Sequence, residues 1–176
     1  AVMAFLASGE DPNFGPYRDS IRRGLRHIIG SQSSVTGYMG PSMYHHGFAT
    51  LALCEAYGSV DDSELFTADE RDKRRDLGAA VDLAVRAAVT AQKQNRRGAW
   101  RYAPNSSEAD TSVSGAVMMG LLAARNAGIN VPDESIDKAL EYFSSMTATD
   151  GSVGYTSVSE GAESVARSSI VNLVFA

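Results

Sequence analysis

The chain has a single cysteine, Cys54, among its 176 residues. An intramolecular disulfide and a zinc site built from cysteines are therefore both excluded. A lone thiol inside an apolar segment usually behaves as a small hydrophobic side chain, and we prefer that interpretation to metal ligation. The cellular compartment stays open, because proteins without disulfides occur on both sides of membranes.

Positive charge and long apolar runs are also scarce. The 16 Lys and Arg residues against 21 Asp and Glu residues give a net charge of −5 and a pI of about 5.2. Such a balance disfavours nucleic acids and anionic membranes as partners. No run approaches the ~20 consecutive apolar residues of a membrane span. The apolar start at residues 1–7 is too short for a signal peptide and lacks a basic flank.

What the sequence does contain is an internal repeat, and the repeat predicts the fold. Three apolar segments end in a glycine, at Gly9, Gly58 and Gly128. Glycine tolerates the left-handed conformation that commonly closes a helix, so each segment is expected to be the end of a helix. A charged stretch at residues 59–76 lengthens the second interval and is expected to be a solvated insertion that runs into a helix start.

Two kinds of helix alternate along the chain. In one kind, apolar residues recur at helical spacing on one face and polar residues cover the other. These amphipathic helices are expected around residues 21–29, 77–88 and 136–146. The other kind is apolar nearly all round and must be covered on most sides. These apolar helices are expected at residues 48–57, 113–124 and 165–176. The alternation predicts stacked helical hairpins with the apolar helices inside.

Each hairpin carries a loop in which glycine accompanies an aromatic residue, at residues 37–38, 98–102 and 151–155. Ser, Thr or Asp then follows and can cap the next apolar helix, with the third start expected near Ser159 or Glu160. Three loops at the same end of three hairpins would form one rim. A ligand or partner could contact this rim through its aromatic and basic side chains. They are Tyr38, Tyr44, Trp100, Arg101, Tyr102 and Tyr155. For Trp100, stacking of one repeat on the next is the preferred role.

The loop from Gln94 to Trp100 has the pattern Gln-x-x-x-Gly-x-Trp. The segment from Gln32 to Tyr38 is a degenerate copy, one residue longer and with Tyr in place of Trp, and the third loop has lost the glutamine. With these motifs the chain resembles the squalene/hopene cyclase and prenyltransferase repeat family, and residues 44–53 resemble inner-helix starts of its bacterial members.

This resemblance implies an α/α toroid of about six hairpins. We expect residues 1–176 to form a single all-α domain, a partial α/α toroid of about three hairpins within a longer chain. Its apolar inner-helix flanks would be exposed, and contiguous exposure of that kind usually marks an interface.

The resemblance also implies chemistry whose residues are missing here. Terpenoid cyclases protonate an alkene with an Asp of an Asp-x-Asp-Asp-Thr-Ala motif. In the nearest stretch Ala109 takes the donor position, Glu108 is one position off, and Asp110 is expected to cap a helix. Protein prenyltransferases bind zinc through Asp, Cys and His, and Cys54 has no such neighbours at useful spacing. Neither a metal nor another cofactor is expected.

Asp110, His45 and His46 are the weak candidates for catalysis. Neighbouring helical residues point about 100° apart, so the two histidines cannot chelate one metal together. One of them could serve as an acid–base group at the mouth of the toroid. The preferred interpretation is that they hold the loop at residues 37–38.

Two functions stay open at this point. The preferred one is a non-catalytic binding or scaffolding module that holds an apolar small molecule or a protein partner on its inner face or rim. The alternative is part of a toroid enzyme, a terpenoid cyclase-like enzyme or a lyase, whose active site is completed by repeats outside this chain.

Overall fold

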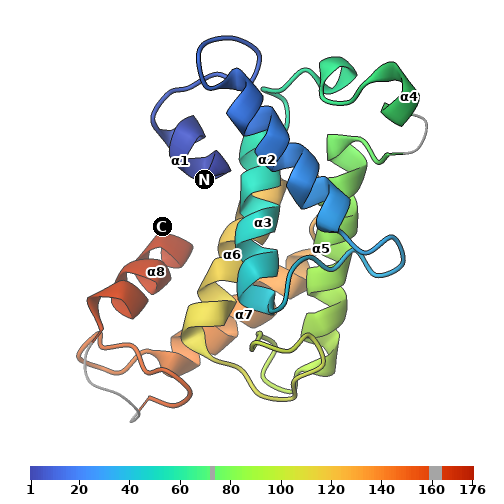
Figure 1. Ribbon diagram of the computed structural model, residues 1–176. Coiled ribbons are helices and arrows are strands. Elements are labelled where there is room, and N and C mark those ends of the chain that lie inside the picture. The colour runs from blue at the N-terminus through green and yellow to red at the C-terminus, as the bar shows by residue number, and fades with distance from the viewer. Residues whose placement is uncertain (72–73, 159–163) are drawn as a thin grey trace.

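A computed structural model describes residues 1–71, 74–158 and 164–176. In these ranges the regular structure is eight α-helices and one short 3-10 helix, η1 (Figure 1). The described ranges contain no β-strand, only an isolated bridge between Thr147 and Val153. The all-α class is therefore confirmed. The expected helix start near Ser159 or Glu160 lies outside the described residues.

The helices alternate between two sets in chain order. One set forms a row in which each helix contacts the next: α1 (Val2–Ala7), α3 (Met43–Ala56), α6 (Thr111–Asn126) and α8 (Val165–Phe175). The other set is α2 (Arg18–Ser31), α5 (Leu77–Gln94) and α7 (Asp133–Met146), and each of these contacts two successive members of the row. In Figure 1, α3 and α6 lie at the centre, with α5 to their right, α2 in front of their upper part and α7 behind them, while α1 and α8 lie to the left.

Burial in α6 and α2 agrees with the predicted difference between covered apolar helices and one-sided amphipathic helices. No side chain between Thr111 and Ala124 of α6 is exposed. The outer helices are one-sided: in α2, Ile21, Leu25 and Ile29 are buried while His27 is exposed. The expectation that residues 113–124 are buried is therefore confirmed. The physical reason is that a helix without charge over that length is stable only when it is covered.

Glycines let neighbouring inner helices approach closely. A Cβ atom built on Gly47 of α3 would lie 2.6 Å from the carbonyl oxygen of Ala116 in α6. A Cβ atom built on Gly115 of α6 would collide with Ile170 of α8. At both positions only glycine leaves room for the neighbouring helix. A close approach of this kind occurs between α3 and α6 and again between α6 and α8.

The glycines that end three of the helices adopt the left-handed conformation that the sequence predicts. Gly9, Gly58 and Gly128 have φ of 85°, 83° and 83°, in the left-handed region. None has an atom within 4 Å of a built Cβ, so the backbone conformation alone requires glycine at these three ends.

The insertion at residues 59–76 is not simply a solvated loop. It forms η1 (Asp62–Glu64) and α4 (Ala68–Arg71) and buries Leu65 and Phe66. Arg22 of α2 is itself buried and donates to the carbonyl oxygens of Glu64 and Pro12. The prediction followed the charges on either side and overlooked the adjacent apolar pair, Leu65 and Phe66, which belongs to the buried core.

Helix α8 differs from the other inner helices. Only Val171 and Val174 are buried, while Val165, Leu173 and Phe175 are exposed. The expectation of exposed apolar inner-helix flanks is therefore confirmed for this helix. None of the described helices is long and apolar enough to cross a bilayer.

Candidate functional site

The three loops between outer and inner helices share one local structure. Each has a glycine in the left-handed region: Gly37, Gly98 and Gly151 have φ of 76°, 70° and 85°. Two residues later each loop buries one side chain. These side chains are Met39, Trp100 and Val153. The repeat is thus glycine, any residue, buried apolar residue, so the structural counterpart of Trp100 in the first loop is Met39 and not Tyr38.

A buried glutamine ties each of the first two loops to the following outer helix. The side-chain amide of Gln32 donates to the carbonyl oxygens of Gly37 (3.0 Å) and Ala80 of α5 (2.9 Å). The amide of Gln92 donates to the carbonyl oxygens of Gly98 (2.7 Å) and Ser135 of α7 (2.8 Å).

The glutamine that makes these contacts in the second loop is Gln92 and not Gln94, the glutamine of the sequence pattern. Gln94 is the last residue of α5, and its side chain is exposed.

Trp100 is buried in the hairpin and is not part of an exposed rim. Its indole Nε1 donates to the carbonyl oxygen of Ala88 in α5 (2.9 Å), and its backbone N–H donates to Oγ of Ser114 in α6 (3.0 Å). Trp100 therefore contacts α5 through its side chain and α6 through its backbone. Its place among the rim residues was wrong. Both contacts lie within one hairpin, so they do not test the expected stacking of one repeat on the next.

The other rim residues lie nearer the surface. The carbonyl oxygen of Tyr102 accepts from the N–H of Met43 (2.9 Å), and that of Tyr155 accepts from the N–H of Thr111 (3.0 Å). Each loop thus accepts a hydrogen bond from a backbone N–H in the first turn of the preceding inner helix, where that N–H has no partner within the helix. The hydroxyls of Tyr102 and Tyr155 are 3.3 Å apart, and this hydrogen bond raises the pKa of Tyr155 to about 12. Arg101 forms an ion pair with Glu108.

His46 is fully buried and both of its ring nitrogens are occupied. Nδ1 accepts from the N–H of Met39 (3.2 Å), and Nε2 lies 3.0 Å from the carbonyl oxygen of Ala84 in α5. A proton on Nε2 satisfies both contacts. Burial lowers the pKa of His46 to about 4, although the bond to Ala84 opposes the shift. The ring also stacks on Tyr38, so His46 holds the first loop in place.

His45 is exposed, and its Nδ1 lies 2.9 Å from Oγ of Ser42. It therefore does not share a site with His46, in agreement with the angle between neighbouring helical residues. His45 lies instead on the side of α3 that faces α2.

Asp110 is the N-cap of α6, as expected. Its Oδ1 accepts from the N–H of Val113 (2.8 Å). Its Oδ2 is buried and has no hydrogen-bond partner among the described residues, and the same holds for the hydroxyl of Tyr142. Burial raises the pKa of Asp110, while the bond to Val113 acts against the shift. For Tyr142, too, burial is the main cause of a raised pKa.

The positions around Asp110 do not supply a cyclase acid. Ala109 is buried and has no ionisable side chain, and the side chain of Glu108 is exposed and paired with Arg101. Cys54 is buried, and burial raises the pKa of its thiol to about 12. Within the described ranges, no group of three or more His, Cys, Asp or Glu residues is arranged to hold a metal ion.

An apolar groove of about 330 Å³ lies between α2 and α3. His27 and Ile28 line it from α2, and Tyr44, His45 and Phe48 line it from α3. The rings of Tyr44 and Phe48 are 5.3 Å apart, and Phe48 is 45% exposed. This groove brings together two sequence-predicted residues, Tyr44 and His45. Phe48 was missed as a site residue, because an apolar residue in an apolar helix gives no sign of its exposure.

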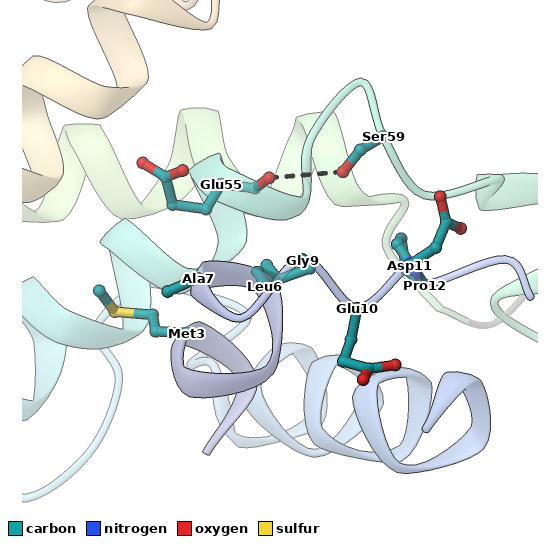
Figure 2. A pocket seen from close by; sticks show the side chains of 9 residues that line it. All are labelled: Met3, Leu6, Ala7, Gly9, Glu10, Asp11, Pro12, Glu55 and Ser59. Atoms are coloured by element: carbon teal, nitrogen blue, oxygen red, sulfur yellow. Dashed lines mark hydrogen bonds between the residues drawn. The ribbon is translucent and has the colours of Figure 1, made fainter. Parts of the chain in front are cut away.

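A second hollow, of about 380 Å³, lies between α1 and the end of α3. Glu10, Asp11 and Glu55 are among its lining residues. Figure 2 shows their carboxylates pointing in different directions instead of toward a common point. The hollow is therefore open and acidic but does not form a ligand cage.

Comparison with protein-family models, curated proteins and solved structures finds no match for this chain.

Proposed function

We propose that this chain is an arc of an α/α toroid, built from squalene-cyclase-like repeats, that works as a non-catalytic binding module. Its ligand is an apolar group, held in the groove between α2 and α3. The observation that carries the proposal is the aromatic, accessible lining of this groove, with Phe48 exposed beside Tyr44. Isolated surface aromatics are common, whereas a concave apolar site with a few polar groups at its edge is typical of small-ligand binding.

The environments of the titratable side chains favour binding over catalysis. His46 is neutral and saturated with hydrogen bonds, and Glu108 is exposed and paired. His45 and Ser42 form a polar edge beside the groove and could orient the ligand. The alternation of inner and outer helices supports the repeat assignment, and the two glutamine contacts that recur between loops and outer helices support it further.

Binding is tested with N-phenyl-1-naphthylamine, whose fluorescence increases in an apolar site. We expect the intact chain to bind the probe and Phe48→Asp to weaken binding at least about tenfold, because a carboxylate would have to be desolvated in the groove. Val35→Asp is the matched control, since Val35 is exposed in the loop after α2 and is not among the residues that line the groove. Equal binding by the intact chain and Phe48→Asp would contradict the proposal.

The second candidate is part of a toroid enzyme, and one observation favours it. Asp110 is a buried carboxyl with a raised pKa and an oxygen without a described partner, features that also occur at general acids. Incubation with squalene or an isoprenoid diphosphate, read by mass spectrometry, tests this candidate. A product that Asp110→Asn abolishes would support the enzyme and overturn the binding module.

A further inference from the structure

The groove between α2 and α3 has polar side chains in its lining but no charged carboxylate, lysine or arginine. These polar side chains are His27 and Ser31 from α2, and Tyr44 and His45 from α3. Both histidines and the Tyr44 hydroxyl can donate a hydrogen bond. A cationic head group would therefore meet no counter-charge in the lining, whereas a carboxylate head would meet hydrogen-bond donors.

The two helices that form the groove are poor in negative charge, although the chain as a whole carries a net charge of −5. Helix α2 has four arginines and a single aspartate, and α3 has no acidic residue before Glu55, near its far end. Arg23 and Arg26 donate to uncharged oxygens and form no ion pair within the described part of the chain. Arg23 lies one helical turn before His27. The field at the groove thus favours an anion over a cation.

The two walls bring opposite helix ends to the groove. His27 and Ser31 lie at the C-terminal end of α2, where unpaired carbonyl groups form the negative end of the helix dipole. Tyr44 and His45 lie in the first turn of α3, where backbone N–H groups form the positive end. An anionic head is therefore more stable against α3 than against α2, and His45 is its expected contact in preference to His27.

His45 is held from two sides. Its Nδ1 lies 2.9 Å from Oγ of Ser42, and a Cβ atom built on Gly40 would lie 2.7 Å from Cβ of His45. When the Ser42 hydroxyl donates to Nδ1, the ring proton is on Nε2, which can then donate to a ligand. His45 is exposed, so this donor is accessible, in contrast to the two occupied nitrogens of His46.

We infer that the ligand of this groove is a single-chain aliphatic carboxylate, with its head at His45 and its chain along Phe48. The inference rests on the proposed function, since it names the ligand class of the same groove. His45 and Phe48 are three residues apart and therefore share one side of α3. The lining has neither lysine nor arginine, so it suits a singly charged carboxylate better than a doubly charged phosphate.

The size of the groove agrees with a single short chain. Its volume of about 330 Å³ is at the lower end of the range for small-ligand sites, roughly 300–1,000 Å³. Octanoate is therefore a suitable probe for the head group.

The test is displacement of N-phenyl-1-naphthylamine by octanoate, compared with octanamide, octylammonium and octyl phosphate. These compounds have similar chains and differ in their heads. We expect octanoate to displace the probe at a concentration at least about fivefold lower than octanamide, because a charge-assisted hydrogen bond replaces a neutral one. Octylammonium should be the weakest competitor, and octyl phosphate should not exceed octanoate.

A pair of histidine variants tests the position of the head. His45→Ala should abolish the preference for octanoate over octanamide, while binding of N-phenyl-1-naphthylamine stays within about twofold, because the apolar lining is unchanged. His27→Ala is the matched control, since His27 also lines the groove but lies at the negative end of α2, and this variant should keep the preference.

Several outcomes would overturn this inference and leave the proposed function intact. They are equal displacement by octanoate and octanamide, stronger displacement by octyl phosphate or octylammonium, and a preference that persists in His45→Ala or is lost in His27→Ala. Failure of the proposed function looks different, because N-phenyl-1-naphthylamine would then bind neither the intact chain nor Phe48→Asp, or would bind both equally.

Discussion

Gln32 and Gln92 occupy equivalent places in two successive hairpins. Each donates through its side-chain amide to the carbonyl oxygen of its own loop glycine and to a carbonyl oxygen of the next outer helix. A single buried side chain thus fixes the loop conformation and the angle of the following helix together. The relationship explains how one hairpin sets the position of the next without a continuous backbone ladder between them.

Replacement of Gln92 should therefore destabilise the fold. Gln92→Ala leaves the carbonyl oxygens of Gly98 and Ser135 without their donor, and we expect a loss of about 2–4 kcal/mol in the free energy of unfolding. Gln94→Ala is the matched control, since Gln94 is exposed, and should change stability by less than about 0.5 kcal/mol. Urea unfolding measures both. Similar losses for the two variants would restore Gln94 as the motif residue.

Gly47 should tolerate no side chain. A methyl group in Gly47→Ala would press on the backbone of Ala116, and we expect a loss of about 1–3 kcal/mol as α3 and α6 move apart. Gly30→Ala in α2 is the control, because its nearest neighbour is the end of the Arg74 side chain at 3.5 Å. Alanine favours helix over glycine, so this control should gain up to about 1 kcal/mol. Thermal unfolding followed by circular dichroism would show the opposite signs.

His46 should make stability depend on pH on the acid side. The pKa of His46 is about 4 in the folded chain, against 6.5 for an ordinary histidine. Because the folded pKa is the lower one, the unfolded chain takes up the proton first as the pH falls. The stability contributed by the neutral ring is complete above pH 6.5 and is lost between pH 6.5 and about 4, a change of about 3 kcal/mol.

The variant His46→Gln removes this proton uptake. The difference in unfolding free energy between the intact chain and His46→Gln should shrink by about 3 kcal/mol from pH 7 to pH 4. Urea unfolding at several pH values measures the difference. A constant difference over this range would show that the pKa of His46 is the same in the folded and the unfolded chain.

Asp110 should stabilise the folded chain through its N-cap hydrogen bond to Val113 and not through its negative charge. Asp110→Asn keeps an oxygen that accepts from the N–H of Val113 and should change stability little, since it also removes a buried carboxylate. Asp110→Ala removes the cap and should cost about 1–2 kcal/mol. Urea unfolding compares the two variants. A large loss in Asp110→Asn would instead indicate that the ionised carboxylate is needed by a group near its Oδ2 atom.

The candidate site was only partly predictable. The sequence placed Tyr44 and His45 at the start of an inner helix, where the groove between α2 and α3 now contains them. It did not show that Phe48 of the same helix is exposed. Apolar composition predicts that a helix is buried as a whole, but the face that stays open depends on where its neighbours end.

By itself the sequence determined the alternation of apolar and amphipathic helices and the glycines that close them, because helical periodicity and backbone freedom are local properties. Only the tertiary structure decided that Gln92 makes the loop contact, that Trp100 is buried and that His46 is saturated with hydrogen bonds. These outcomes depend on carbonyl groups that helix packing brings close: Ser135 and Ala84 lie far along the chain from Gln92 and His46, and Ala88 accepts the Trp100 indole across the α5–α6 hairpin.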